Sequence, residues 1–126
     1  MMNILIVEDD PTDMKLLSVV LDASGHHVLG KASAEEAARE IARRQPELIL
    51  LDLKLPGMDG LALARIIKQN PATRAIPIVA ITAAREKFTR EDALGAGCDA
   101  FLLKPVDTRK LSEQVTRAAD KYPSRP

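Results

Sequence analysis

The feature of this sequence that most constrains its fold is a fivefold alternation of short apolar runs with longer helical stretches. The apolar runs predict strands over residues 3–7, 27–30, 47–51, 76–81 and 100–103. Four of these runs are nearly continuous in aliphatic or aromatic residues, which is typical of strands buried on both faces. The second run, His27-Val28-Leu29-Gly30, is weaker and predicts an edge strand.

Helix signals occupy the intervals between the runs. Asp10-Pro11 supplies an N-cap and a proline at the first helical position, and Gly25 is a suitable stop for that helix. Ser33-Ala34-Glu35-Glu36 predicts a capping box at the second helix. The remaining helices are expected after residues 57–60 and before Pro71, from about Glu86 to Ala96, and from Asp107 onward.

The alternation predicts an α/β fold, with an open parallel sheet covered by helices on both faces. Right-handed crossovers would place the carboxyl ends of all strands at one edge of that sheet. A chain of 126 residues has the length of one domain. We expect this domain to cover residues 1–120 and to be followed by a disordered tail over residues 121–126.

Composition excludes several classes of function. The formal net charge is zero, which gives no general attraction to nucleic acid or to acidic membranes. No apolar run approaches the roughly 20 residues that span a bilayer, and no signal-peptide pattern is visible. Cys98 is the only cysteine, so an intrachain disulfide is excluded. We expect a soluble cytoplasmic protein that binds neither DNA nor a membrane.

Polar residues suited to phosphate chemistry stand at the ends of four apolar runs. Glu8-Asp9-Asp10 follows the first run, Asp52 closes the third, Thr82 follows the fourth and Lys104 follows the fifth. At the common edge of a parallel sheet, these residues would bring carboxylates, a hydroxyl and an ammonium together. This combination indicates that Asp52 is a site of phosphorylation.

The three carboxylates of Glu8, Asp9 and Asp52 would repel one another unless a cation lay between them. Mg²⁺ suits such a site because it accepts one or two carboxylates together with waters and a substrate phosphate. Asp10 is better explained as a helix cap. Lys104 could reach Asp52 and then pair with a phosphoryl oxygen, although a lysine at a strand end can also simply extend into solvent.

The sequence pattern also suggests roles for several further residues. The hydroxyl of Thr82 could donate to a phosphate oxygen, although threonine is common in strands. Ala83 would leave room for an incoming phosphoryl group. Phe101 is expected to be a core residue. His26 and His27 would point to opposite faces of an extended segment, which predicts a solvated strand start rather than a metal site.

Four segments of the chain resemble the receiver domain of bacterial response regulators: Ile4–Pro11, Leu48–Gly60, Ile78–Ala83 and Gly95–Pro105. They occur in the family's order and spacing, and the resemblance covers nearly the whole chain. It implies a flavodoxin-like (βα)5 fold with strand order 2-1-3-4-5. It also implies a two-component signalling domain rather than an enzyme. Such a domain accepts a phosphoryl group on Asp52 from a sensor histidine kinase or histidine phosphotransfer protein.

The resemblance assigns roles to the site residues. It implies Mg²⁺ (or Mn²⁺) bound by Asp9, Asp52 and the main-chain carbonyl of Lys54, with Glu8 acting through water. It implies that Thr82 and Lys104 contact the phosphate beside Ala83, and that the Lys104–Pro105 peptide bond is cis.

The resemblance also implies how the signal is read and how long it lasts. Phe101 matches an aromatic switch that turns inward as Thr82 moves toward the phosphate. The change would bias the surface of the fourth helix, fifth strand and fifth helix, where a downstream protein would bind. Lys54 and Ala84 are positions that tune kinetics in the family. Ala84 offers no polar group to assist water, so we expect slow self-dephosphorylation.

Other classes remain as alternatives. A receiver used only for docking would keep the fold without being phosphorylated. An aspartyl-phosphate phosphohydrolase would need an Asp-x-Asp pattern after the first strand, and Glu8-Asp9-Asp10 lacks it. In a flavin carrier, the same three acids would repel the cofactor's phosphate. No output domain follows Ala119, so the signal is expected to pass by contact with another protein or along a phosphorelay.

Overall fold

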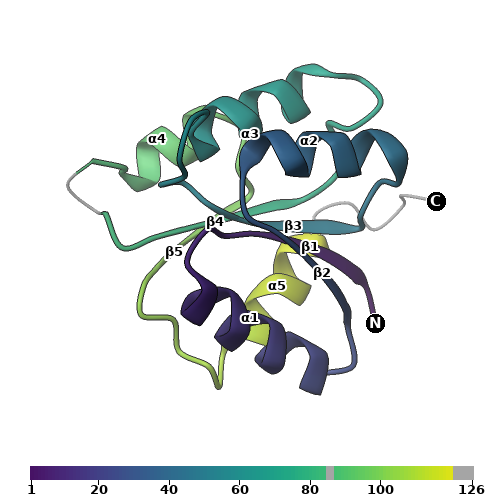
Figure 1. Ribbon diagram of the computed structural model, residues 1–126, viewed down its shortest axis with the longest axis vertical. Helices are drawn as coiled ribbons and strands as arrows, with labels where there is room; N and C mark the ends of the chain where they lie inside the picture. Colours follow the sequence, from purple (N-terminus) through teal and green to yellow (C-terminus); the bar gives the residue numbers. More distant parts are fainter. Residues whose placement is uncertain (85–86, 121–126) are drawn as a thin grey trace.

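A computed structural model describes residues 1–84 and 87–120 of the chain (Figure 1). The predicted tail over residues 121–126 lies outside the described residues. The described strands form one parallel sheet in the order β2-β1-β3-β4-β5. They are β1 (Asn3–Val7), β2 (His27–Lys31), β3 (Leu48–Asp52), β4 (Ile78–Thr82) and β5 (Ala100–Leu103). The predicted flavodoxin-like α/β fold and its strand order are confirmed.

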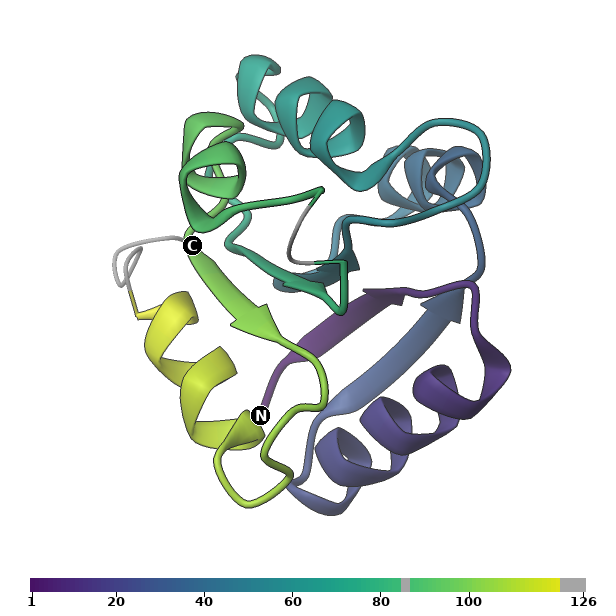
Figure 2. The same cartoon turned by 90° about the vertical axis from the view of Figure 1, so that its left-hand side faces the viewer.

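Helices alternate with these strands and cover both faces of the sheet. They are α1 (Pro11–Ala23), α2 (Ala34–Arg43), α3 (Gly60–Gln69), α4 (Arg90–Gly95) and α5 (Leu111–Ala119). Helices α1 and α5 lie on one face, and α2, α3 and α4 lie on the other (Figures 1 and 2). No described helix is both long enough and apolar enough to cross a membrane.

Each face of the sheet has its own hydrophobic core, because successive strand residues point to opposite faces. In β1, Ile4 and Ile6 belong to the cluster under α1 and α5. Leu5 and Val7 belong to the cluster under α2, α3 and α4. Strands β3 and β4 are buried at every position, as their continuous apolar runs predicted.

The two edge strands are β2 and β5. The weak pattern of β2 predicted its edge position correctly, and Leu29 is 45% exposed there. The prediction that β5 is buried on both faces is wrong. Its residues are only half-buried and Leu103 is 38% exposed. The physical reason is that β5 pairs with β4 alone, so its other side has no neighbouring strand.

The ends of β3 and β4 lie later than predicted. The sequence placed these strands at residues 47–51 and 76–81, whereas β3 ends at Asp52 and β4 at Thr82. Asp52 therefore pairs with Ile81, and Thr82 pairs with Leu103. Both polar residues are held by the ladder of the sheet rather than by a loop.

Helix capping also differs from the prediction. Ser33 caps α2 by accepting a hydrogen bond from the backbone N–H of Glu36 at 3.1 Å. The reciprocal bond of a capping box is not part of this cap, because the Glu36 carboxylate meets the Ser33 hydroxyl instead. A complete capping box lies at α4, between Thr89 and Asp92.

Two helices begin later than their sequence patterns indicated. Helix α4 starts at Arg90 because Thr89 caps it there, and the start predicted at Glu86 lies outside the described residues. Helix α5 starts at Leu111 rather than at Asp107, since residues 108–110 form a turn.

His26 contradicts the prediction of a solvated strand start. The side chain is buried, and its Nδ1 accepts a hydrogen bond from the backbone N–H of Met2 at 3.0 Å. His27, the next residue, is exposed. Burial, together with the positive charge of the chain's amino terminus, lowers the pKa of His26 from its ordinary value. The fold therefore favours the neutral imidazole.

This preference predicts a pH-dependent stability. Because the pKa of His26 is lower in the folded than in the unfolded chain, the free energy of unfolding should fall as pH drops below about 6.5. His26→Asn keeps an acceptor near Nδ1 but does not titrate, so it should lose less stability between about pH 7.5 and 5.5 than wild type.

Urea unfolding at each pH measures this difference. His27→Asn is the matched control at the exposed neighbour and should follow wild type. The prediction fails if His26→Asn and wild type lose equal stability over this interval.

Candidate functional site

A cleft of about 560 Å³ opens at the carboxyl edge of the sheet. The strand order reverses between β1 and β3 there, which is where doubly wound sheets bind ligands. The loop after β1, the first turn of α1 and the β3–α3 loop form one part of the wall. Ala83, Ala84 and Lys104 form the rest.

A cluster of carboxylates lies in this cleft. One oxygen each from Glu8, Asp9 and Asp52 lie within 4.8 Å of one another. Glu8 is 2% and Asp52 4% exposed, whereas Asp9 is open to solvent. The backbone N–H of Asp10 donates to Glu8 Oε2 at 3.1 Å, and that of Lys54 donates to Asp52 Oδ1 at 3.0 Å. This donor set fits a hard divalent cation.

Lys104 places an ammonium among these acids. Its Nζ donates to Glu8 Oε1 at 2.6 Å, Asp13 Oδ2 at 2.8 Å and Asp52 Oδ2 at 3.0 Å. Its backbone N–H donates to the carbonyl of Thr82 at 2.9 Å, which continues the pairing of β4 and β5 past Leu103. The contact with Asp52 that the sequence predicted is therefore present, and the following Lys104–Pro105 peptide bond is cis.

Sequence reasoning missed Asp13. An acid in the first turn of a helix is usually explained by its favourable position near the positive end of the helix dipole. The signal that could have identified Asp13 is its closeness in the chain to the acids that follow β1, since the first turn of α1 begins at the same edge of the sheet. Asp10, which the sequence assigned to capping, does cap α1 by accepting from the N–H of Thr12 at 2.8 Å.

Burial and charge change the protonation of the cleft. Burial raises the pKa of Glu8 to about 7, although the hydrogen bond from Lys104 opposes the rise and the nearby Asp52 charge adds to it. Burial alone would lower the pKa of Lys104, but the hydrogen bonds of Asp13, Glu8 and Asp52 outweigh it and raise that pKa above its ordinary value. Lys104 therefore stays charged, and Glu8 is close to titration near neutral pH.

Thr82 and Phe101 do not line the cleft. Thr82 is fully buried, and its Oγ1 accepts a hydrogen bond from the backbone N–H of Ala84 at 3.0 Å. Phe101 is half-buried and packs against the core under α2, α3 and α4. Ala83 and Ala84 line the cleft, and Lys54 lies exposed on its β3–α3 side.

The β3–α3 loop is held close to Asp52 by Gly60. The backbone N–H of Gly60 donates to the carbonyl of Leu53 at 3.0 Å. A Cβ at this position would lie 2.6 Å from the carbonyl oxygen of Asp52 and 2.7 Å from the Cα of Leu53, both of them backbone atoms. Only glycine fits this approach, which explains the glycine that follows Met58-Asp59 in the sequence.

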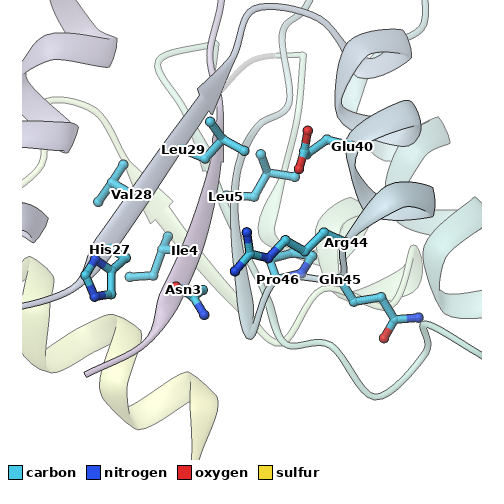
Figure 3. Close-up of a pocket in the computed structure, with 10 residues that line it drawn as sticks. All are labelled: Asn3, Ile4, Leu5, His27, Val28, Leu29, Glu40, Arg44, Gln45 and Pro46. Carbon is cyan, nitrogen blue, oxygen red and sulfur yellow. The ribbon is translucent and has the colours of Figure 1, made fainter.

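A second pocket, of about 370 Å³, lies near the amino ends of β1 and β2 beside α2 (Figure 3). Glu40 of α2 and Arg44, which follows that helix, line it together with Leu5 and Leu29 of the sheet. None of the site residues predicted from the sequence lines it. We therefore assign the candidate site to the acidic cleft at the opposite edge of the sheet.

The fold and the cleft together define a class of protein: a doubly wound α/β domain with an acid cluster and a half-buried lysine in the cleft at its switch point. The family model of the response regulator receiver domain matches residues 4–116. The chain therefore belongs to the response regulator receiver domain family, as its four motifs predicted.

Two curated relatives illustrate the range of the family. The polar-differentiation response regulator DivK of Brucella ovis is 33% identical over 113 residues, which cover 90% of this chain and 92% of DivK. The phosphate regulon transcriptional regulatory protein PhoB of Pseudomonas aeruginosa is 37% identical over 109 residues. They cover 86% of this chain but 48% of PhoB.

Solved structures agree with this assignment. The receiver domain of a signal transduction histidine kinase from Syntrophus aciditrophicus superimposes with a TM-score of 0.88 at 32% identity, covering 100% of this chain and 96% of that one. The receiver domain of the sensor histidine kinase PA1611 from Pseudomonas aeruginosa gives 0.86 at 32% identity, covering 94% and 98%. That structure has a magnesium ion coordinated in its active site cleft.

The ion network predicts a large effect of removing Lys104. Lys104→Met should lower the free energy of unfolding by about 3 kcal/mol at pH 8 in buffer without divalent cations, because Glu8 and Asp52 lose their counter-ion. Without the hydrogen bond from the ammonium, the folded-state pKa of Glu8 rises above about 7, so the loss should grow as pH increases through about 7 to 8.

Urea denaturation of both proteins at each pH tests this effect. Lys110→Met, at an exposed lysine, is the control and should stay within about 0.5 kcal/mol of wild type. A Lys104→Met protein as stable as wild type at pH 8 would show that the ammonium does not compensate the acids.

Proposed function

We propose that this chain is a single-domain response regulator that accepts a phosphoryl group on Asp52 in a Mg²⁺-dependent reaction. The donor would be a phosphohistidine of a sensor histidine kinase or of a histidine phosphotransfer protein. The observation that carries the proposal is the convergence of Lys104 and the acid cluster on the carboxylate of Asp52 at the end of β3. The proposed domain covers residues 1–120, and its proposed location is the cytoplasm.

The acid cluster suits a divalent cation. Asp9, Asp52 and the main-chain carbonyl of Lys54 would hold Mg²⁺ (or Mn²⁺), with Glu8 acting through a water. When bound, the cation neutralises charge on the transferring phosphoryl group and on the carboxylates. Only oxygen donors are required, and the described cluster supplies them.

The residues of the chain account for the transfer itself. A carboxylate oxygen of Asp52 attacks phosphorus in line, the bond from phosphorus to the donor's imidazole nitrogen breaks, and an acyl phosphate forms. The hydrogen bond from the Lys54 N–H to Oδ1 fixes the orientation of the Asp52 carboxylate. The ammonium of Lys104 offsets the negative charge on the phosphoryl oxygens.

The bond between Thr82 and Ala84 provides a means of reading the phosphorylated state. The acyl phosphate carries about −1.5 to −2 charges and strong acceptor oxygens. For its hydroxyl to donate to such an oxygen, Thr82 would turn toward the cleft. Because the N–H of Ala84 donates to the same Oγ1, this turn would either break that bond or pull Ala84 along, and in both cases the loop after β4 would move. With Phe101 turning inward, the change would bias the face of α4, β5 and α5, where a downstream protein would bind without direct contact to DNA.

Labelling with acetyl phosphate tests the proposal. Wild type should gain one stable phosphoryl group in the presence of Mg²⁺ and none after chelation, and Asp52→Asn should gain none because the nucleophile is lost. Asp22→Asn, at an exposed acid of α1, is the control and should be labelled like wild type. Absence of Mg²⁺-dependent labelling from several donors would favour the alternative of a docking module.

The surroundings of the acyl phosphate predict its lifetime. Lys54 stands on one side of the cleft and Ala84 on the other, and Ala84 has no polar group to orient an attacking water. The phosphorylated protein should persist for minutes or longer in Mg²⁺, as followed by loss of label after removal of the donor. Decay within seconds would contradict this expectation.

A further inference from the structure

The hydrogen bonds of Lys104 leave no free proton on its ammonium. A lysine ammonium has three N–H donors, and each of them already has a carboxylate acceptor, on Glu8, Asp13 or Asp52. Under the proposed function, a phosphoryl oxygen must also bind this ammonium. It can do so only by displacing one of the three acceptors.

The three acceptors differ in what displacement would cost. The side chain of Glu8 is 1% exposed, so releasing it would leave its buried oxygen Oε1 without the hydrogen-bond donor it now has. Asp52 is the nucleophile and keeps its negative charge until it attacks phosphorus, so it still holds the ammonium when the donor's phosphoryl group arrives. The side chain of Asp13 is 35% exposed and lies in the first turn of α1, so a released carboxylate can be hydrated and still faces the positive end of the helix. Asp13 is therefore the acceptor that is displaced at least cost.

We propose that Asp13 is a positioning residue that competes with the phosphoryl group for Lys104. This inference rests on the proposed function of Asp52. In the unphosphorylated protein, the carboxylate of Asp13 holds the ammonium toward α1. Removing that carboxylate makes one N–H of Lys104 available, so the site should bind a phosphoryl group more tightly and acquire it faster.

The hydrogen-bond partners of Lys104 support this role. The hydrogen bond to Asp13 is one of the three that raise the pKa of Lys104. The contact joins residues 91 positions apart in the chain, one on α1 and one after β5. Asp13 is thus well placed to act on the ammonium without touching the acid cluster that would hold the cation.

The chain offers a matched pair of variants. Asp13→Asn keeps the size of the side chain but replaces a charge-assisted hydrogen bond with a weaker neutral one. Asp10→Asn removes one negative charge from the same cleft, while asparagine caps a helix as well as aspartate does. Lys104 donates to Glu8, Asp13 and Asp52 but not to Asp10, so the difference between the two variants separates the Lys104 contact from the general effect of charge.

The probe is beryllium trifluoride, a non-covalent analogue of the phosphoryl group, titrated by calorimetry at saturating Mg²⁺ in each protein. Asp13→Asn should bind it about fivefold more tightly than wild type, the ratio expected when a charged acceptor is exchanged for a neutral one. Its initial rate of labelling by acetyl phosphate should rise in the same proportion. Asp10→Asn should change the affinity and the labelling rate by clearly less than Asp13→Asn does. Asp13→Glu, which keeps the carboxylate, should give values close to those of wild type.

The outcomes are distinguishable. If wild type binds the analogue and is labelled, but Asp13→Asn binds no more tightly than Asp10→Asn, the inference about Asp13 is wrong and the proposed function stands. Weaker binding by Asp13→Asn would likewise overturn it, since Asp13 would then assist the site. If wild type neither binds the analogue nor is labelled, the proposed function falls, and the role of Asp13 falls with it.

Discussion

The rest of the site depends on one interaction, the contact of the Lys104 ammonium with carboxylates that are largely removed from water. Glu8 and Asp52 are buried side by side, and their charges would repel each other strongly without a counter-ion. Lys104 enters from the edge strand on the far side of β4, so the ion network joins β1, β3 and β5 through a single side chain. A cation in the acid cluster would complete this compensation of charge.

The register of the sheet explains why these groups meet. Val7 pairs with Leu51, so Glu8 and Asp52 follow at the ends of adjacent strands about 4.8 Å apart. Asp52 pairs with Ile81, and Thr82 pairs with Leu103, so Lys104 comes next along the same edge. A shift of one residue in any of these pairings would turn the site residues toward the opposite face of the sheet.

The accuracy of the sequence predictions follows from how local each signal is. The bounds of β1 and β5 are as predicted, because apolar runs are read directly from the chain. The burial of β5 was misjudged, since an apolar run does not reveal how many strands flank it. The same limit applies to His26, whose buried imidazole accepts a hydrogen bond from Met2, 24 positions away in the chain. The start of α4 was predicted too early because its helical pattern is weak, and the capping box of Thr89 and Asp92 sets its first residue.

The sequence by itself determined the fold class, the family and the residue types at the strand ends, because alternation and motifs are properties of neighbouring residues. The motifs at the strand ends placed Asp52 and Lys104 at one edge of the sheet. Only the tertiary structure decided that Asp13 shares the ammonium of Lys104, and that the hydroxyl of Thr82 is engaged with Ala84 rather than facing the cleft. These contacts depend on where α1 packs and on how the chain turns after β4, and no local pattern encodes either.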